Sequence, residues 1–256
     1  MIFCFSGTGN SLLVARELAA RTGREITMLE KELLLRPQER LFELAEGEDA
    51  IWVFPVHSWG VPPVVRRFIR KCKLKAPPSA RHWMIATCGD DIGRADDQWR
   101  QEIGRRGWSP MGAFSVAMPN TYVCMKGFDV DSEEVAAAKL AAMPDRVGEI
   151  AAAIKRGFSG GDVVRGDHAW LKTAAVYPLF RAFCMSPGAF RADPAKCSGC
   201  GLCASECPLG NIEMKDGMPQ WGPACAMCLR CYHGCPSRAV DHGKATLGKG
   251  RKPVYR

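Results

Sequence analysis

The chain has 256 residues, of which 47% are hydrophobic and 24% are charged. This composition excludes intrinsic disorder, and the length predicts two domains. The formal net charge is +8, but residues 241–256 hold five Lys or Arg against one Asp and so supply half of it. We expect this basic tail to be a solvated, disordered end. Steering toward an acidic partner protein is the alternative, and no nucleic-acid partner is expected.

Residues 1–157 alternate short apolar runs with amphipathic segments, a pattern typical of βαβ units. The intervening segments predict helices, the last of which starts near Ser132 and should kink or restart at Pro144. The fold class is therefore α/β, with a doubly wound, five-stranded parallel sheet. The apolar runs that predict its buried strands are Met1–Phe5, Ile26–Leu29, Ala50–Phe54, Trp83–Thr87 and Ala113–Met118.

Residues 158–189 are predicted to form a linker followed by an inter-domain helix. The stretch 158–166 is rich in Gly and polar residues, which is typical of a domain boundary. Residues 169–190 should be largely helical, interrupted by Pro178, and packed between two domains. The apolar side chains available for burial there are Trp170, Tyr177, Leu179, Phe180 and Phe183. No apolar run reaches membrane-spanning length.

Thirteen cysteines are present, eight of them within residues 190–240. Met1 leads directly into a Gly-rich turn without the features of a secretory leader, so we expect a cytoplasmic protein. In that reducing compartment, cysteines at two-residue gaps indicate metal binding rather than disulfides. The other five cysteines are expected to pack as small apolar residues, with Cys88 the one closest to a predicted cofactor loop.

The eight clustered cysteines form two copies of Cys-x2-Cys-x2-Cys-x3-Cys-Pro. Structural zinc sites also use Cys-x2-Cys pairs, but three equally spaced thiols followed by Cys-Pro, occurring twice, favour iron–sulfur clusters. Residues 190–240 resemble the bacterial two-[4Fe–4S] ferredoxin module, a small α+β domain. The resemblance implies that the fourth cysteine of each copy binds the other cluster. One cluster is then assigned to Cys197, Cys200, Cys203 and Cys235, and the other to Cys225, Cys228, Cys231 and Cys207.

A second motif, Ser6-Gly7-Thr8-Gly9-Asn10-Ser11, lies between the first predicted strand and the first predicted helix. This position surrounds a small anion with backbone N–H groups and hydroxyl or amide side chains. The motif lacks the lysine of a nucleotide-triphosphate loop, and Leu12 replaces the third glycine of a dinucleotide fingerprint. It therefore predicts a loop for a terminal monophosphate.

This loop resembles the FMN-phosphate loop of flavodoxins, and the resemblance covers residues 1–157. It implies that FMN binds at the switch point between strands one and three. In the loop after strand three, which contains Pro55, Trp59 and Gly60, an aromatic is expected to cover the flavin, and Trp59 is the candidate. The loop after strand four, with Cys88, Gly89 and Asp90, is expected to face the pyrimidine end.

Purely structural roles for these residues stay open as alternatives. Trp59 could belong to the core, and Asp90 suits a turn or a helix cap. His57 could donate a proton to the flavin, although we expect a solvated loop histidine. Tyr122 could border the flavin edge or lie partly buried where a strand ends.

The combination resembles the family of flavodoxin–ferredoxin fusion proteins. It implies an electron-transfer protein with two [4Fe–4S] clusters and FMN, whose partners are redox proteins of the ferredoxin-carrier or reductase type. The alternative is an FMN-dependent reductase of a small organic acceptor such as a quinone, for which room above the flavin would be the sign. An interaction protein that has lost its flavin is a third possibility. The expected division is 1–157 (flavin domain), 158–189 (linker and helix), 190–240 (cluster domain) and 241–256 (tail).

Overall fold

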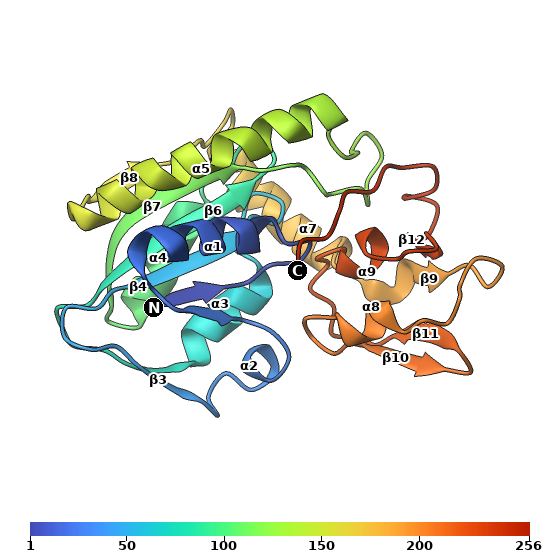
Figure 1. The fold of residues 1–256 in the computed structure, drawn as a ribbon, viewed down its shortest axis with the longest axis horizontal. Coiled ribbons are helices and arrows are strands. Elements are labelled where there is room, and N and C mark those ends of the chain that lie inside the picture. The colour runs from blue at the N-terminus through green and yellow to red at the C-terminus, as the bar shows by residue number, and fades with distance from the viewer.

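The computed structural model describes the backbone of residues 1–256 and every side chain except that of Pro187. Its N-terminal part is built on a parallel sheet of six strands in the order β2-β1-β4-β6-β7-β8 (Figure 1). The first five in this order are the flavodoxin-like arrangement, in which the third strand along the chain lies beside the first. The strands are β1 (Ile2–Cys4), β2 (Ile26–Met28), β4 (Ala50–Pro55), β6 (Arg81–Cys88), β7 (Ser109–Ala117) and β8 (Gly160–Asp162).

The sheet has one strand more than the five predicted. β8 lies in the segment expected to be a linker and pairs with Gly112–Phe114 of β7. It consists of Gly-Gly-Asp and so lacks the apolar residues that predict a buried strand. The α/β fold class is confirmed, and the sheet extends to Asp162, beyond the expected domain end at residue 157.

Helices cover both faces of the sheet (Figure 1). Helices α1 (Asn10–Thr22) and α5 (Glu133–Lys155) pack on one face, where their apolar side chains meet Ile2 and Cys4 of β1. Helices α3 (Pro63–Lys71) and α4 (Ala95–Arg105) pack on the other face, against Phe3 and neighbouring aromatic side chains. Helix α5 runs through Pro144 as one helix, so the predicted restart there does not occur. A short helix, α2 (Glu32–Leu35), and a two-stranded parallel pair, β3 (Leu41–Glu43) and β5 (Lys73–Lys75), lie beside α3.

The C-terminal part is the small α+β unit that the cysteine motifs predict. Strand β9 (Phe190–Ala192) pairs antiparallel with β12 (Val240–His242), and β10 (Ile212–Lys215) forms a hairpin with β11 (Met218–Trp221). Two short helices, α8 (Leu202–Ser205) and α9 (Arg230–His233), complete it. Its core includes Val123 from the N-terminal part, so the two parts share apolar contacts.

The connecting segment is one helical stretch made of α6 (Ala169–Leu171), a π-helical turn (Lys172–Val176) and α7 (Tyr177–Phe183). The wider π turn ends two residues before Pro178, a residue that cannot donate the usual helical hydrogen bond, and the helical stretch is not interrupted there as expected. Tyr177 and Phe180 are buried, whereas Trp170 and Phe183 are 64% and 76% exposed. The prediction that these two exposed residues and Leu179 pack between domains is therefore wrong.

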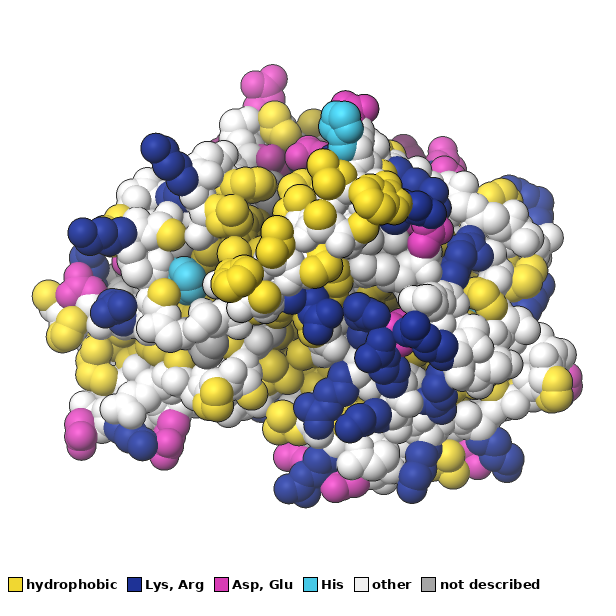
Figure 2. Space-filling model, turned by 180° about the vertical axis from the view of Figure 1, so that it is seen from behind, with side chains coloured by type: hydrophobic (Ala, Val, Ile, Leu, Met, Phe, Trp, Pro, Cys, Tyr) yellow, Lys and Arg dark blue, Asp and Glu magenta, His cyan; other side chains and the backbone are white. Residues whose placement is uncertain are grey.

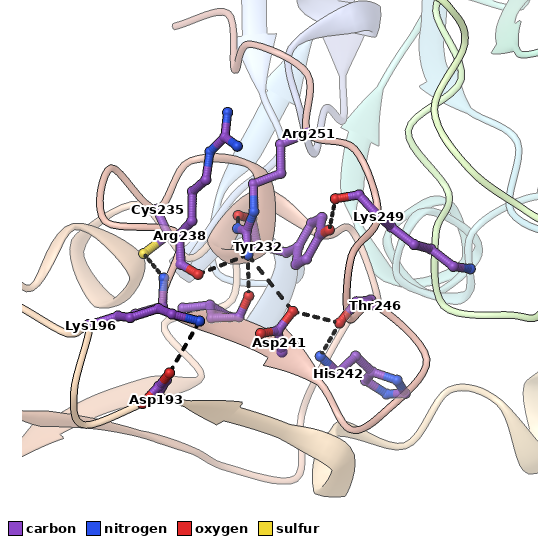
Figure 3. A network of polar contacts seen from close by, with 12 residues as sticks. Asp193, Lys196, Tyr232, Cys235, Arg238, Asp241, His242, Thr246, Lys249 and Arg251 are labelled. Carbon is purple, nitrogen blue, oxygen red and sulfur yellow. Dashed lines mark hydrogen bonds and ion pairs between the residues drawn. The ribbon is translucent and has the colours of Figure 1, made fainter.

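The basic tail is ordered, so the prediction of a solvated, disordered end is wrong. The Lys249 ammonium donates hydrogen bonds to the carbonyl oxygens of Val123, Met125 and Phe128, at 2.5–2.7 Å. Figure 3 shows Arg251 beside Tyr232, with its guanidinium carbon 3.8 Å from the ring centroid. The acceptors of these cations lie elsewhere in the sequence. The composition of the tail alone therefore could not predict that it packs against the rest of the protein.

Within the described part of the chain, no helix combines the length and the hydropathy needed to cross a lipid bilayer.

Candidate cofactor sites

The two cysteine motifs fold into loops of the same backbone shape. In each, the residue before and the residue after the second cysteine have positive φ angles, and the later one caps a short helix that carries the third cysteine. Left-handed residues at alternate positions turn successive backbone amides toward one concave side, an arrangement that suits an anionic group. These residues are Gly199 and Gly201 in the first loop, and Met227 and Leu229 in the second.

Each motif ends in a Cys-Pro turn whose sulfur accepts a hydrogen bond from the amide four residues later. Asn211 N donates to Cys207 Sγ and Ala239 N to Cys235 Sγ, both at 3.3 Å. Although burial acts in the opposite direction, hydrogen bonds from the Ser237 hydroxyl and nearby amides hold the pKa of Cys235 below its usual value. N–H···S bonds of this kind stabilise thiolates and tune the metal centres that they bind.

The thiols fall into two spatial groups. Burial raises the pKa of Cys203 to about 11, with further contributions from Cys235 and Cys200. Burial raises the pKa of Cys228 to about 12, with further contributions from Cys225 and Cys207.

Burial raises the pKa of Cys231 well above its usual value, and Cys225 and Cys207 raise it further. Cys207 thus lies among the thiols of the second motif, and Cys235 among those of the first. The resemblance to two-cluster ferredoxins implies the same exchange of Cys207 and Cys235.

Among the described residues, no three His, Cys, Asp or Glu side chains are arranged around a single metal ion. A cube of four irons and four sulfides spreads its thiolates much more widely than one ion does. The thiols, the inward amides and the N–H···S bonds together fit that larger group.

The predicted phosphate loop follows β1 and leads into α1, with Gly9 at φ +104° before the helix. Hydrogen bonds among the described residues use the amides of Phe5 and Leu13 on either side, but not those of Gly7, Thr8 or Gly9. Three N–H groups at a helix N-terminus are thus available to an anion. The residues present therefore fit a phosphate group.

The side chains of this loop do not contribute equally. Ser11 Oγ hydrogen-bonds Thr87 Oγ1 at 2.7 Å, and Asn10 Nδ2 donates to the Pro119 carbonyl at 2.8 Å. Ser6 Oγ accepts a 3.3 Å hydrogen bond from Leu12 N. Asn10 and Ser11 therefore tie the loop to β6 and to the segment after β7, whereas the hydroxyls of Ser6 and Thr8 can still donate hydrogen bonds to a phosphate.

Two distant segments lie directly against this loop. A Cβ atom placed on Gly7 would stand 2.7 Å from both the Cβ and the carbonyl oxygen of Cys228, so only glycine permits this approach. The Tyr255 amide donates to the Thr8 carbonyl at 3.0 Å. One cysteine loop and the C-terminal tail thus close over the phosphate loop.

Two adjoining cavities lie at the carboxyl ends of the strands, where ligands of doubly wound sheets bind. The smaller, about 120 Å³, is lined by the phosphate loop, by Pro55 and His57 after β4, by Cys88 and Gly89 after β6, and by Cys228. The larger, about 630 Å³, is within the size range of small-molecule sites. Their shared lining residues are Val56, Ser58, Cys88, Gly89, Asn120, Tyr122 and Phe180.

The remaining predicted residues lie in or near the larger cavity. Trp59 lines it, with its carbonyl oxygen accepting a hydrogen bond from Thr173 Oγ1 at 2.8 Å. Asp90 also lines it, but its side chain is 92% exposed and stands 3.8 Å from Lys139 Nζ. Gly60 lies under the Tyr177 ring, where a Cβ would come within 2.5 Å of the ring, and lines neither cavity.

His57 differs from the solvated loop histidine that we expected. It lines the smaller cavity, its Nδ1 is buried, and that atom has no hydrogen-bond partner among the described residues. Burial lowers the pKa of His57 to about 4. An unpartnered, buried ring nitrogen beside the phosphate loop is the kind of group that a bound ligand satisfies.

Sequence reasoning missed the residues that close the site from a distance. Met227, Leu229 and Phe180 line the smaller cavity, and Tyr255 covers Gly9. The cysteine spacing marks the neighbourhood of the first two. No local pattern marks Tyr255.

Comparisons with known proteins found one family model and similar solved structures. Residues 190–213 match the family model described as a 4Fe-4S binding domain. The chain is similar to a candidate flavoprotein from Bacteroides uniformis ATCC 8492, with 15% identity, 46% of this chain and 90% of that chain covered, and a TM-score of 0.35. It is also similar to the Trp repressor binding protein from Bacillus subtilis, with 14% identity, 57% and 97% covered, and a TM-score of 0.34. No curated protein matches the chain.

Proposed function

We propose that the protein is a cytoplasmic electron-transfer protein that holds two [4Fe–4S] clusters and FMN and exchanges electrons with a redox partner protein. The approach of Cys228 to Gly7 carries the proposal, because it puts a predicted cluster ligand in contact with a predicted phosphate loop. When bound, the clusters supply single-electron exchange and the flavin supplies one- or two-electron chemistry.

The chain gives the two cysteine groups different surroundings. Cys200, in the first group, is exposed to solvent, and helix α8 beside it has no buried residue. The second group includes Cys228, which lies between Met227 and Leu229, each only 3% exposed. The first group is therefore suited to meet a partner protein, and the second to a position inside the molecule.

His57 and the loop around it have a separate role in the proposal. With a pKa of about 4, the His57 ring is neutral at pH 7. One ring nitrogen therefore carries a proton and donates a hydrogen bond, and the other accepts a hydrogen bond. The ring can hold a hydrogen bond to a bound flavin without adding a positive charge.

A second candidate function is reduction of a small organic acceptor, which the larger cavity favours. Its walls are mostly apolar and include Trp59, Tyr122 and Phe180. Steady turnover of a soluble quinone by the reduced holoprotein supports this function, and reduction only by protein partners supports the carrier.

The test of the main proposal uses anaerobic holoprotein mixed with a reduced bacterial ferredoxin while the visible absorbance of clusters and flavin is followed. We expect flavin reduction in the parent protein and much slower reduction in Cys200→Ser, which loses a ligand of the exposed cluster. Ser205→Ala, in helix α8 beside Cys200, is the matched control and should behave as the parent. Equal rates in all three proteins would contradict electron entry through the clusters.

A further inference from the structure

The stretch formed by α6, the π turn and α7 presents an apolar face to solvent. It buries Thr173, Tyr177 and Phe180 against the rest of the molecule. Two more apolar side chains, Met125 and Phe128, are exposed across the larger cavity from it, at 42% and 39%. We call these seven exposed side chains the apolar face: Met125, Phe128, Trp170, Leu171, Val176, Leu179 and Phe183.

This clustering is unusual for a surface. The whole protein has twelve exposed large hydrophobic side chains among the described residues, and seven of them belong to the apolar face. Figure 2 shows them as a yellow area with dark blue side chains directly beside it. Contiguous apolar surface of this kind marks a site of interaction.

Basic side chains gather beside the apolar face, and the exposed carboxylate of Asp90 lies in the wall of the larger cavity. No Asp or Glu occurs between His168 and Ala192. Arg181 of α7 and four basic residues of α3 line a hollow of about 290 Å³ whose only other lining residue is Pro63. We call it the basic hollow: Arg66, Arg67, Arg70, Lys71 and Arg181.

Only part of this positive charge is neutralised within the protein. The buried carboxylate of Glu102 pairs with Arg66 at 2.6 Å and with Arg70 at 2.5 Å. Within the described part of the chain, Arg67, Lys71 and Arg181 have no acidic partner. The apolar face and the basic hollow together therefore suit a partner that is both apolar and anionic.

We propose that the apolar face and the basic hollow bind the surface of an anionic phospholipid bilayer. A surface helix with Trp, Phe and Leu outward, flanked by Lys and Arg, is the arrangement that inserts shallowly between lipid headgroups. The anionic headgroups meet the unpaired cations of the basic hollow. In this orientation the mouth of the larger cavity, which Val176, Leu179 and Phe183 border, faces the bilayer.

Two other occupants fit less well. A two-fold dimer through this face would bring the basic hollows of both copies close together, and like charges repel. A redox protein that exchanges electrons with the exposed cluster must approach Cys200, and residues 197–235 contribute nothing to the apolar face. Binding to a bilayer does not depend on the redox function proposed above.

The test is sedimentation of the holoprotein with vesicles of phosphatidylcholine alone or mixed with phosphatidylglycerol. We expect binding to the mixed vesicles, weakened by salt, and a blue shift of tryptophan fluorescence as Trp170 enters the interface. Leu179→Ser with Phe183→Ser should lower the partition coefficient roughly tenfold or more. Arg181→Gln with Lys71→Gln should lower it to a similar extent on the mixed vesicles.

The substituted side chains are exposed, so the variants should fold, which iron content and thermal unfolding check. Leu247→Ser, at an equally exposed position outside the apolar face, is the control and should bind as the parent does. Failure of the holoprotein to bind either kind of vesicle would overturn the proposal. So would a concentration-dependent dimer in analytical ultracentrifugation that the Leu179 and Phe183 substitutions abolish.

Discussion

The two cysteine loops share a backbone but differ in the side chains placed on it. At three equivalent positions the φ angle is positive in both loops, between 51° and 73°. The first loop has glycine at each position, and the second has larger residues. The pairs are Gly199 and Met227, Gly201 and Leu229, and Gly210 and Arg238.

Larger residues in this conformation cost about 1–2 kcal/mol each. Met227 and Leu229 are both 3% exposed, and burying such side chains contributes about 1.5–3 kcal/mol each. Burial of Met227 and Leu229 in the core that includes Val123 and Tyr232 therefore offsets the strain at these two positions, whereas Arg238 is exposed. The first loop faces solvent, where no burial is available, and uses glycine. The comparison shows that one backbone shape occurs in both an exposed and an internal cysteine loop.

The largest expected effect comes from pairs of cysteine substitutions that separate the two ways of sharing ligands. If Cys207 serves the cluster of the second loop, Cys207→Ser with Cys228→Ser damages one cluster and leaves about four iron atoms per chain. Cys207→Ser with Cys200→Ser then damages both clusters and leaves almost no iron. Iron and sulfide analysis distinguishes them, and the reverse pattern would show that each motif binds its own cluster.

Gly7→Ala tests the contact between the second loop and the phosphate loop. The new Cβ would lie 2.7 Å from Cys228, so we expect a loss of about 1–3 kcal/mol in the free energy of unfolding and weaker FMN binding. Urea unfolding and flavin titration measure both. Gly104→Ala in α4, where no other atom lies within 4 Å, is the matched control and should stabilise by up to about 1 kcal/mol. Unchanged FMN affinity in Gly7→Ala would show that this loop does not bind the flavin.

The sheet should respond to acid independently of the cysteine loops. Burial lowers the pKa of His82 to about 4, and Trp52 Nε1 donates to its Nδ1 at 3.1 Å. Above the usual histidine pKa of 6.5 the ring is neutral in both folded and unfolded chains, so no stability is lost. As the pH falls below 6.5, the unfolded chain takes up the proton first.

His82 should therefore reduce the free energy of unfolding by about 2 kcal/mol between pH 7 and pH 5. Urea unfolding at the two pH values, followed by far-ultraviolet circular dichroism, measures this loss. His82→Phe should make the loss about 2 kcal/mol smaller. The same pH dependence in both proteins would contradict the neutral, buried ring.

The smallest effects compare equivalent positions of the two loops. Gly201→Ala forces a side chain into the left-handed conformation with only Met214, 4.0 Å away, to contact, so we expect a loss of about 1 kcal/mol. Leu229→Gly relieves strain but loses buried surface, for a net loss of about 1 kcal/mol. Urea midpoints of the holoproteins measure both. A Leu229→Gly variant more stable than the parent would show that the leucine contributes no useful packing.

Local sequence patterns predicted the features that depend on neighbouring residues: the buried strands and the backbone shapes of the candidate loops. The apolar runs located five strands, because strands buried on both faces need continuous apolar residues. The glycine loop and the cysteine spacing located the candidate sites, because phosphate and iron–sulfur groups demand particular backbone shapes. Asn10 and Ser11 belong to the right loop, yet their side chains hold other segments.

What the sequence did not reveal depends on contacts between distant segments. Strand β8 is held by backbone pairing alone, and the tail by carbonyl groups more than a hundred residues away. Trp170 and Phe183 look like core residues by type, but the helix turns them outward. The role of Trp59 beside a flavin stays a prediction.

The central claim is that one chain holds two clusters and a flavin in contact. Iron, acid-labile sulfide and acid-released flavin, each measured per chain on anaerobically purified protein, test it most directly. We predict about eight iron, about eight sulfide and one FMN. A full iron and sulfide content without flavin, even after FMN is added, would contradict the claim and leave a ferredoxin joined to a flavodoxin-shaped docking domain.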